Sequence, residues 1–464
     1  MLLTKGNAGI VLGLMAVAVL LWAMLAERPA EVYEYRLDNG LKILVQPDRR
    51  SPVVVSQVWY KVGSGYEPAG ITGISHMLEH MMFKGTDELK PSEFSAIIAA
   101  NGGEDNAFTS YDYTTYFQRI ASDRLELCFK LEADRMRDLI IDEQELTKER
   151  DVVAEERRWR YDDNPQSLTL EKFMATAYPE GPYHHPVIGW MDDIQSFTTA
   201  AARDWYRRWY APNNATLVVV GDVEPEAVHE LAEKYFGPLQ PSSDITPAPS
   251  QPADAQTEPR YVEVKAPAKL PYVLMGYKVP SLMTAGDRDE AYALEVLSGV
   301  LDGGSSARLS RDLLRGKQLA ASAGASYDLI QRLDGFLSLN AVPVAGVTTE
   351  QLIEALKEEV ARLQQEPVSE TELSTVRAQV VASDVYQRDS VFYQAMELGT
   401  LETTGVGWQV QQEYINRVEQ VTPQQIQAVA RKYLTPERLT VAVLIPQDAN
   451  AKISQSANAK GAAR

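Results

Sequence analysis

One short segment constrains this chain more than any other: residues 75–83, with the sequence SHMLEHMMF. Residues four apart lie on one face of a helix, so a helix here would place His76 and His80 one turn apart, with Glu79 between them. Two imidazoles at that spacing can bind one Zn²⁺ and leave positions for a third ligand and a water molecule. A carboxylate beside that water can accept its proton, since the metal lowers the water's pKa. The segment therefore predicts a zinc site with a general base, in the inverted HxxEH arrangement of zinc peptidases.

The number of histidines supports this interpretation. The chain has five, and two of them fall on this face with a glutamate in the required place. A lone histidine on an apolar helix is more often a core or surface residue than a ligand. The combination favours a metal site over that alternative. A third protein ligand is still needed to complete a catalytic zinc site.

The third ligand is expected from residues 145–159, the next helical stretch that contains several carboxylates. Glu149 and Glu156 are seven residues apart and therefore share a face of the helix. Taken alone, the stretch is typical of a charged, solvated helix. Only together with the two histidines does one of its carboxylates become a candidate ligand.

These segments resemble the pitrilysin family of inverted-motif zinc peptidases, and the resemblance extends over nearly all of residues 33–445. Residues 73–86, GISHMLEHMMFKGT, are similar to the family's zinc helix, and residues 149–156, ERDVVAEE, look like its second signature. The resemblance implies one Zn²⁺ per chain. It also implies a role for each of five residues: ligands His76, His80 and Glu156, general base Glu79, and Glu149 as support for the site.

Glu155 competes with Glu156 for the role of third ligand. Neighbouring residues on a helix point about 100° apart, so only one of these two carboxylates can face the metal. The resemblance favours Glu156, because the last glutamate of the signature is the ligand in the family.

Residues 106–110, NAFTS, lead into a stretch rich in β-forming residues. This segment resembles the family's active-site edge strand, where a substrate peptide pairs through backbone hydrogen bonds. The resemblance implies that Ala107, Phe108 and Thr109 contact the substrate. The alternative, which the residues alone favour, is an ordinary hairpin strand.

A segment in the second half of the chain carries a further expectation. Residues 301–322 look like a family segment in which an arginine and a tyrosine seven residues later reach towards the substrate carbonyl. Arg315 matches the arginine and would contact substrate, but this chain is one residue shorter here and has Ala321 where the tyrosine is expected. An alanine cannot donate to a developing oxyanion, a contribution worth about 3 kcal/mol. We therefore expect a related subunit to supply the Arg/Tyr pair in a heterodimer, with a homodimer as the alternative.

The chain repeats itself. In each half a helix leads through a short proline-containing turn into an apolar strand, at residues 198–223 and again at 422–446. Together with the resemblance, this predicts an α+β fold of two homologous α/β-sandwich domains, each a mixed, mostly antiparallel sheet flanked by helices. The pair would form half of a clam-shell. The expected segments are a signal anchor at 1–30, a catalytic zinc-binding domain at 31–240, a linker at 241–262, a second domain without zinc at 263–447 and a disordered tail at 448–464.

Composition and the N-terminus bear on partners and location. The net charge of −19 excludes a basic stripe for nucleic acid, and the single Cys128 excludes an internal disulfide. Residues 8–26 carry no charge and follow Lys5, so they predict a single-pass membrane helix with the catalytic domains in the periplasm of a bacterium. The alternative is a signal peptide whose removal leaves a secreted or periplasmic protein.

The expected function is that of a zinc-dependent endopeptidase that hydrolyses peptides or unfolded polypeptide segments. The alternative is a non-catalytic structural or assembly subunit of a pitrilysin-like heterodimer. Such subunits typically lose their zinc ligands, whereas this chain keeps the residues named above.

Overall fold

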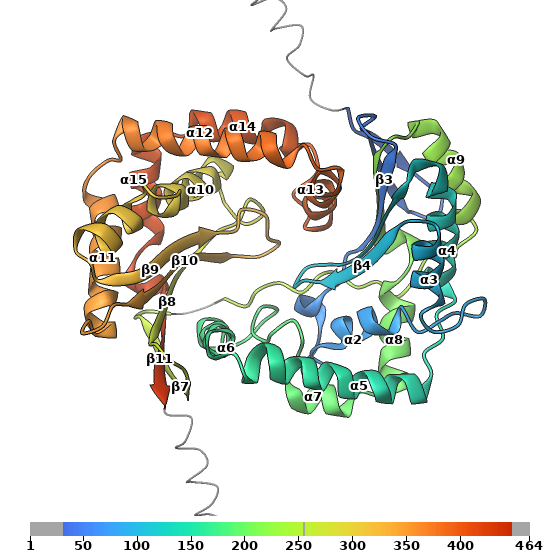
Figure 1. The fold of residues 1–464 in the computed structure, drawn as a ribbon, viewed down its shortest axis with the longest axis horizontal. Helices are drawn as coiled ribbons and strands as arrows, with labels where there is room; N and C mark the ends of the chain where they lie inside the picture. The colour runs from blue at the N-terminus through green and yellow to red at the C-terminus, as the bar shows by residue number, and fades with distance from the viewer. Residues whose placement is uncertain (1–30, 254–255, 448–464) are drawn as a thin grey trace, which may run out of the picture.

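The structure is a computed structural model that describes residues 31–253 and 256–447. Two β-sheets form the framework of the protein (Figure 1). We call residues 31–237 the first half and residues 260–447 the second half. The first sheet has the strand order β1-β2-β6-β3-β5-β4: β1 (Tyr33–Arg36), β2 (Lys42–Pro47), β3 (Val53–Tyr60), β4 (Glu104–Thr109), β5 (Thr114–Ala121) and β6 (Ala215–Gly221). The second has the order β7-β11-β8-β10-β9: β7 (Arg260–Pro267), β8 (Tyr272–Val279), β9 (Ala320–Tyr327), β10 (Gly335–Pro343) and β11 (Leu439–Gln447).

Both sheets are mixed and mostly antiparallel. In the first, β2 and β6 run parallel and the other neighbours run antiparallel. In the second, β7 and β11 are the parallel pair. The predicted pair of α/β domains with mixed sheets is therefore confirmed. The first domain begins with a hairpin, as an Asn39-Gly40 turn between two β-rich stretches predicts: β1 and β2 pair antiparallel around Gly40, whose φ of 93° favours glycine.

Helices of the first half cover one face of its sheet and form the larger core there, which includes Cys128. The helices of the first half are α2 (Ile74–Met81), α3 (Glu93–Ala100), α4 (Leu125–Arg137), α5 (Glu143–Arg157), α6 (Pro165–Ala177), α7 (Met191–Ser196), α8 (Thr199–Trp209) and α9 (Pro225–Tyr235), with short turns η1 (Ser64–Tyr66), η2 (Ser122–Arg124), η3 (Arg158–Asp162) and η4 (Pro212–Asn214). Of these, α6 packs on the second sheet instead. The helices of the second half are α10 (Arg288–Asp302), α11 (Thr349–Gln365), α12 (Glu370–Gln387), α13 (Val391–Thr403), α14 (Val410–Gln420) and α15 (Pro423–Tyr433), with turns η5 (Leu309–Gly316) and η6 (Pro436–Arg438).

One helix of each half packs on the sheet of the other half. Helix α13 of the second half packs on β3 and β6 of the first, and α6 of the first half packs on β7 and β11 of the second. This exchange explains why β6 is buried along its whole length: helices cover both faces of the sheet, so a continuous apolar run replaces the alternation of a half-exposed strand. Gly399 on α13 lies flush against the ring of Trp59, where a Cβ atom would come within 1.9 Å of the indole.

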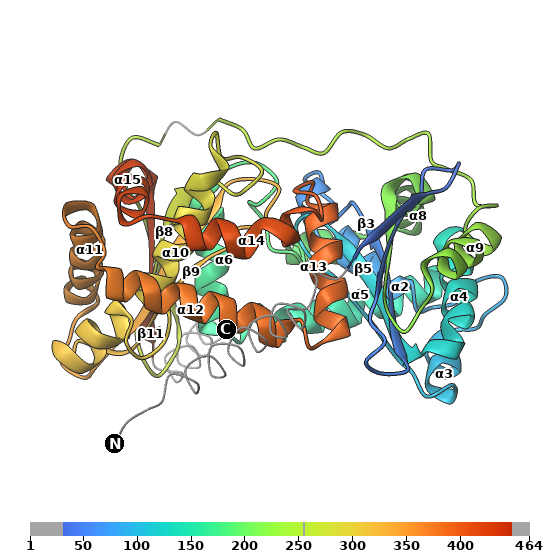
Figure 2. The same cartoon turned by 90° about the horizontal axis from the view of Figure 1, so that it is seen from above.

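The two halves are joined by a long segment that runs along one side of the molecule (Figure 2). Strand β7 begins at Arg260, inside the segment predicted as a linker. In the described part of the chain, no helix is both long and apolar enough to span a membrane. The predicted anchor at residues 8–26 and the predicted tail at 448–464 lie outside the described residues.

Candidate active site

The helix α2 carries the predicted motif. Two features fix where it starts: the backbone conformation of Gly73 and hydrogen bonds to the buried carboxylate of Glu67. Gly73 precedes α2 with φ of 89°, and a Cβ atom there would meet the carbonyl oxygen of Ile188 at 2.2 Å. The carboxylate of Glu67 accepts hydrogen bonds from the backbone N–H of Gly73 at 2.6 Å and of Ser75 at 2.8 Å. These bonds satisfy N–H groups that the first turn of a helix leaves unpaired. Burial raises the pKa of Glu67 to about 8.

The three residues predicted as ligands come together where α2 packs against α5. One ligand atom from each of His76, His80 and Glu156 lies within 4.8 Å of the others. The Nε2 atoms of the two histidines lie 3.8 Å and 3.4 Å from the two carboxylate oxygens of Glu156. No other group of three such side chains with this spacing occurs in residues 31–253 and 256–447.

The donor set fits a zinc ion. Two imidazole nitrogens and one carboxylate oxygen, with room for a water, form the ligand set of a catalytic zinc site. Burial lowers the pKa of His76 to about 4, so this imidazole is neutral and its nitrogen lone pair is available. Burial opposes the charge on His80 too, but its hydrogen bonds with Glu149 and Glu156 raise its pKa to about 9.

Glu149 orients His80 from behind. Its Oε2 lies 3.0 Å from His80 Nδ1, and its Oε1 lies 2.5 Å from Lys84 Nζ. When Nδ1 donates its proton to this carboxylate, Nε2 is the nitrogen that can give up its own proton and bind a metal, which is how outer carboxylates fix the tautomer of ligating histidines. Although burial opposes it, hydrogen bonds from His80 and Lys84 lower the pKa of Glu149.

Glu79, the predicted general base, lies beside the cluster and contacts the edge strand β4. Thr109 Oγ1 donates a hydrogen bond to Glu79 Oε2 at 2.6 Å. Burial raises the pKa of Glu79, and the bond from Thr109 partly offsets the rise. A carboxylate whose pKa is raised above its ordinary value holds a proton more readily, as a general base must once it has accepted one.

The structure separates the two candidates for the third ligand. Glu156 faces the histidines, and its Oε1 also lies 2.8 Å from Arg160. The side chain of Glu155 is 73% exposed and pairs with Arg158 instead. The two adjacent side chains on α5 thus point in different directions, as the angle of about 100° between neighbouring residues of a helix requires.

The predicted substrate-contacting residues lie in two places. Ala107, Phe108 and Thr109 form the end of β4, which is the edge of the first sheet next to α2. Arg315 lies on η5 in the second half, exposed, and donates to the carbonyl of Ser305. Ala321 is exposed on β9. The structure therefore brings β4 to the metal cluster and leaves Arg315 in the other half of the chain.

Four contacts escaped the sequence reasoning: those of Lys84, Glu67 and Arg160, and the bond between the Thr109 hydroxyl and Glu79. Lys84 lies three residues beyond the end of α2 and reaches Glu149 on another helix, so no local spacing in the sequence indicates this contact. The Thr109 and Glu67 contacts depend on loops and sheet register, for which a single sequence holds no local pattern.

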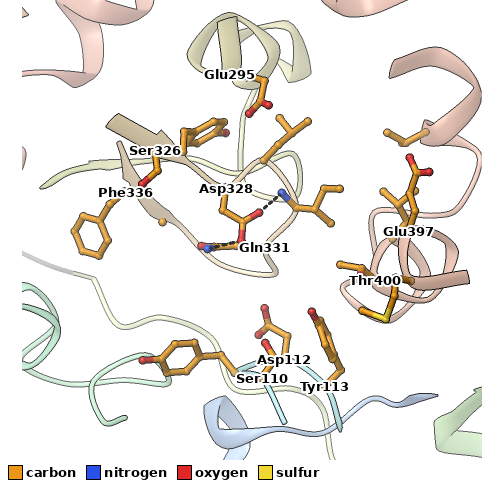
Figure 3. Close-up of a pocket in the computed structure, with 18 of the residues that line it drawn as sticks. Ser110, Asp112, Tyr113, Glu295, Ser326, Asp328, Gln331, Phe336, Glu397 and Thr400 are labelled. Atoms are coloured by element: carbon orange, nitrogen blue, oxygen red, sulfur yellow. Dashed lines mark hydrogen bonds between the residues drawn. The ribbon is translucent and has the colours of Figure 1, made fainter. Parts of the chain in front are cut away.

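A pocket of about 850 Å³ opens between the halves, and its lining includes neither Glu79 nor the three residues of the metal cluster (Figure 3). Ser110 and Asp112, which follow β4, lie on one side of it, and Asp328 and Gln331 of the β9–β10 loop lie opposite. Glu295 adds a third carboxylate from α10. Burial raises the pKa of Glu295 to about 7.

Comparisons with known proteins point to one peptidase family. The family profile described as insulinase, peptidase family M16, matches residues 42–189, and the profile described as peptidase M16 inactive domain matches residues 196–380. Zinc protease PqqE of Helicobacter pylori is 38% identical over 330 residues, which cover 70% of this chain and 72% of that protein. The uncharacterized zinc protease YmxG of Bacillus subtilis is 27% identical over 415 residues, covering 89% and 98%.

Solved structures show the same fold. The crystal structure of a protease from Helicobacter pylori superposes with a TM-score of 0.85 at 32% identity, covering 90% of this chain and all of that one. A peptidase M16 inactive domain from Pseudomonas fluorescens gives a TM-score of 0.81 at 18% identity, covering 90% of this chain and 98% of that one. The second likeness concerns the fold alone.

Proposed function

The chain belongs to peptidase family M16, the insulinase or pitrilysin family, and on that premise we propose that it is a zinc-dependent endopeptidase for peptides and unfolded polypeptide segments. The observation that carries the proposal is the convergence of His76, His80 and Glu156 within 4.8 Å, beside the carboxylate of Glu79. The relatives named zinc proteases support zinc as the metal, and we propose one ion per chain.

In this proposal each residue has one task. The chemistry that a zinc ion would supply at this site is polarisation of the scissile carbonyl and a lowered pKa of the attacking water. His76, His80 and Glu156 hold the ion, while Glu149 keeps His80 in the tautomer that binds through Nε2. Glu79 accepts the proton of the water and later gives it to the leaving amine. The edge strand β4 offers backbone groups for pairing with an extended substrate.

A metal analysis combined with digestion of an unstructured peptide tests the proposal. The wild-type protein should hold about one zinc per chain and cleave the peptide. Glu79→Gln should keep its zinc and lose about 10²–10⁴-fold in turnover, because general acid–base catalysis contributes that much. His76→Ala should lose the metal. A wild-type protein without zinc, or a Gln variant that cleaves at the wild-type rate, would contradict the proposal.

A second candidate function is that of a non-catalytic subunit, or a catalytic subunit that works only with a partner. Ala321 favours it, because the chain lacks the tyrosine expected there. We propose that this chain is half of a clam-shell completed by a related subunit that supplies an Arg/Tyr pair, with a homodimer as the alternative. Sedimentation of the purified chain, together with its peptide digest, separates these cases. Full activity from a monomer or homodimer would remove the need for another subunit.

We propose, finally, that the catalytic domains lie in the periplasm, anchored in the inner membrane by residues 8–26. The uncharged run and the preceding Lys5 support this placement. Intact mass of the protein extracted from the membrane fraction tests it: retention of residues 1–30 indicates an anchor, and their loss indicates a removed signal peptide.

A further inference from the structure

We propose that the side chain of Thr109 is a positioning residue for the general base, a role separate from any backbone pairing of β4 with substrate. Its hydroxyl holds the carboxylate of Glu79 in the orientation from which it accepts a proton. The inference rests on the proposed peptidase function and deepens it by adding a residue to the reaction.

The contact itself is short and directional. Thr109 Oγ1 lies 2.6 Å from Glu79 Oε2, and the hydroxyl must donate because an ionised carboxylate only accepts. Hydrogen bonds with an ionised partner are shorter and stronger than neutral ones. Within residues 31–253 and 256–447, no other hydrogen bond to the Glu79 side chain is found, so one oxygen is held and the other is left for proton transfer.

The position of Thr109 is set by the fold. Side chains alternate along a strand, so Ala107 and Thr109 point to the same face, and Ala107 packs into the core that contains α2. Thr109 pairs with Thr114 at the last register position of the β4–β5 hairpin. Because its side chain is β-branched, few rotamers are available to the hydroxyl.

The loop that follows is fixed from outside the sheet. Ser64 N–H donates to the carbonyl of Ser110 at 3.0 Å, and Gly65 N–H donates to that of Tyr111 at 2.8 Å. A Cβ atom on Gly63 would meet the Ser110 carbonyl at 2.2 Å, so the two backbones touch because this residue is glycine. The donor is therefore preorganised, whereas a glutamate side chain by itself can rotate about three bonds.

Loss of the hydroxyl should reduce turnover more than binding. A base acts only when it lies within hydrogen-bond reach of the proton, about 2.6–3.2 Å between heavy atoms. Valine has nearly the shape of threonine and keeps the backbone of β4, so substrate pairing should persist. Removal of partners that orient reactive groups typically reduces activity about 10–100-fold, and we expect kcat of Thr109→Val to fall in that range with KM little changed.

The test compares three substitutions in the full chain loaded with zinc: Thr109→Val, Thr109→Ser and Thr115→Val. Thr115 lies on β5, fully buried, and its hydroxyl has no hydrogen-bond partner in the described part of the protein. Thr115→Val thus removes the same atom without removing a hydrogen bond. Zinc content, melting temperature, kcat and KM on one unstructured peptide are measured for each.

We expect Thr109→Ser to restore most of kcat, Thr115→Val to match wild type, and all variants to hold zinc. Adding Thr109→Val to Glu79→Gln should not change the residual rate, because the group it orients is gone. A Thr109→Val variant as fast as Thr115→Val, or an equal fall in the Glu79→Gln background, would overturn the inference. A wild-type protein without zinc-dependent cleavage would overturn the proposed function and this inference together, so the two failures are distinguishable.

Discussion

The two halves of this chain have the same strand topology, but the metal cluster lies in the first half. Reading each sheet from its parallel pair, β2-β6-β3-β5-β4 corresponds to β7-β11-β8-β10-β9, and only β1 lacks a counterpart. In each half the helix after the central strand, α2 or α10, lies behind the edge strand. Threonine-capped helices α8 and α15 lead into β6 and β11 in the same way. The duplication predicted from sequence is thus visible in the strand order.

The difference between the halves lies in a few side chains. Helix α2 is short, starts at a glycine and places two histidines and a glutamate near α5. Helix α10 is longer, starts at the cap residue Asp287 and fills its inner face with apolar residues such as Leu294 and Leu297. All five histidines of the chain lie in the first half. In the duplicated fold, α2 therefore supplies residues of the metal cluster, whereas the corresponding helix α10 supplies apolar residues to a core.

The edge strands differ as well. In β9 the N–H of Ala325 donates to Asp302 of α10, and η5 lies beside the strand. Side chains that bind edge N–H groups hinder pairing with another chain. In β4 the N–H of Ala107 likewise donates to the side chain of Asn106, and the side chain of Thr109 turns towards Glu79. The two edges therefore differ in what lies beside them: β4 lies next to α2 and the metal cluster, whereas β9 lies next to α10 and η5.

The largest expected effect concerns a pair of neighbours. Glu156→Gln should reduce zinc content towards zero and abolish cleavage, because the cluster loses its carboxylate. Glu155→Gln, which alters an exposed side chain paired with Arg158, should keep both. Metal analysis and peptide digestion of the two variants check this. Zinc lost from Glu155→Gln instead would show that the helix presents the other carboxylate.

The next effect compares a buried glutamate in each half. Glu149→Gln should weaken zinc binding about 10–100-fold, since it orients His80. Glu359→Gln in the second half removes a buried carboxylate that pairs with Arg362 and should lower the melting temperature without changing zinc affinity. Competition with a chromophoric chelator measures the affinities. Equal zinc affinities for the two variants would erase the contrast between the halves.

A third prediction concerns the contact that joins the halves. Gly399→Ala would place a methyl group within 1.9 Å of the buried Trp59 ring, and overpacking of this kind lowers the free energy of unfolding by about 1–3 kcal/mol. Gly286→Ala is the matched control, because nothing lies within 4 Å of the new atom. Denaturant unfolding checks both. Equal midpoints would mean that α13 can move away from the sheet easily.

The smallest expected effect is a pH dependence of protein stability that arises where α13 contacts the first half. Hydrogen bonds from Arg50, and then from Gln394 of α13, lower the pKa of Asp48 to about 2 against the pull of its burial. A carboxylate with a lowered folded-state pKa stabilises the protein above the ordinary value of 3.8, and this stability is lost as pH falls towards 2.

The difference in unfolding midpoint between wild type and Asp48→Asn should therefore shrink between about pH 4 and pH 2. Asp123→Asn, which removes a carboxylate that is 74% exposed, serves as the control. A difference in midpoint that stays constant over this pH range would show that the hydrogen bonds of Asp48 do not stabilise the contact between α13 and the first half.

Much of the scaffold was readable from local patterns. The β1–β2 hairpin follows from Asn39-Gly40, and the buried β6 follows from its continuous apolar run. The helix pairs of the duplication follow from repeated capping and proline signals. The exchange of α6 and α13 between the halves was not readable, because each helix shows only that one face is apolar and not which sheet it covers.

The sequence by itself determined two of the metal-cluster residues, since a spacing of four on a helix forces His76 and His80 onto one face, and it narrowed the third to Glu155 or Glu156, of which the family resemblance favours Glu156. Tertiary structure alone decided what surrounds them: that Glu156 rather than Glu155 faces the imidazoles, that Lys84 neutralises Glu149, and that Thr109 reaches Glu79. The physical reason is that helical period is a local property of the chain, whereas hydrogen bonds between residues 30 or more positions apart depend on how sheet, loop and helix pack together.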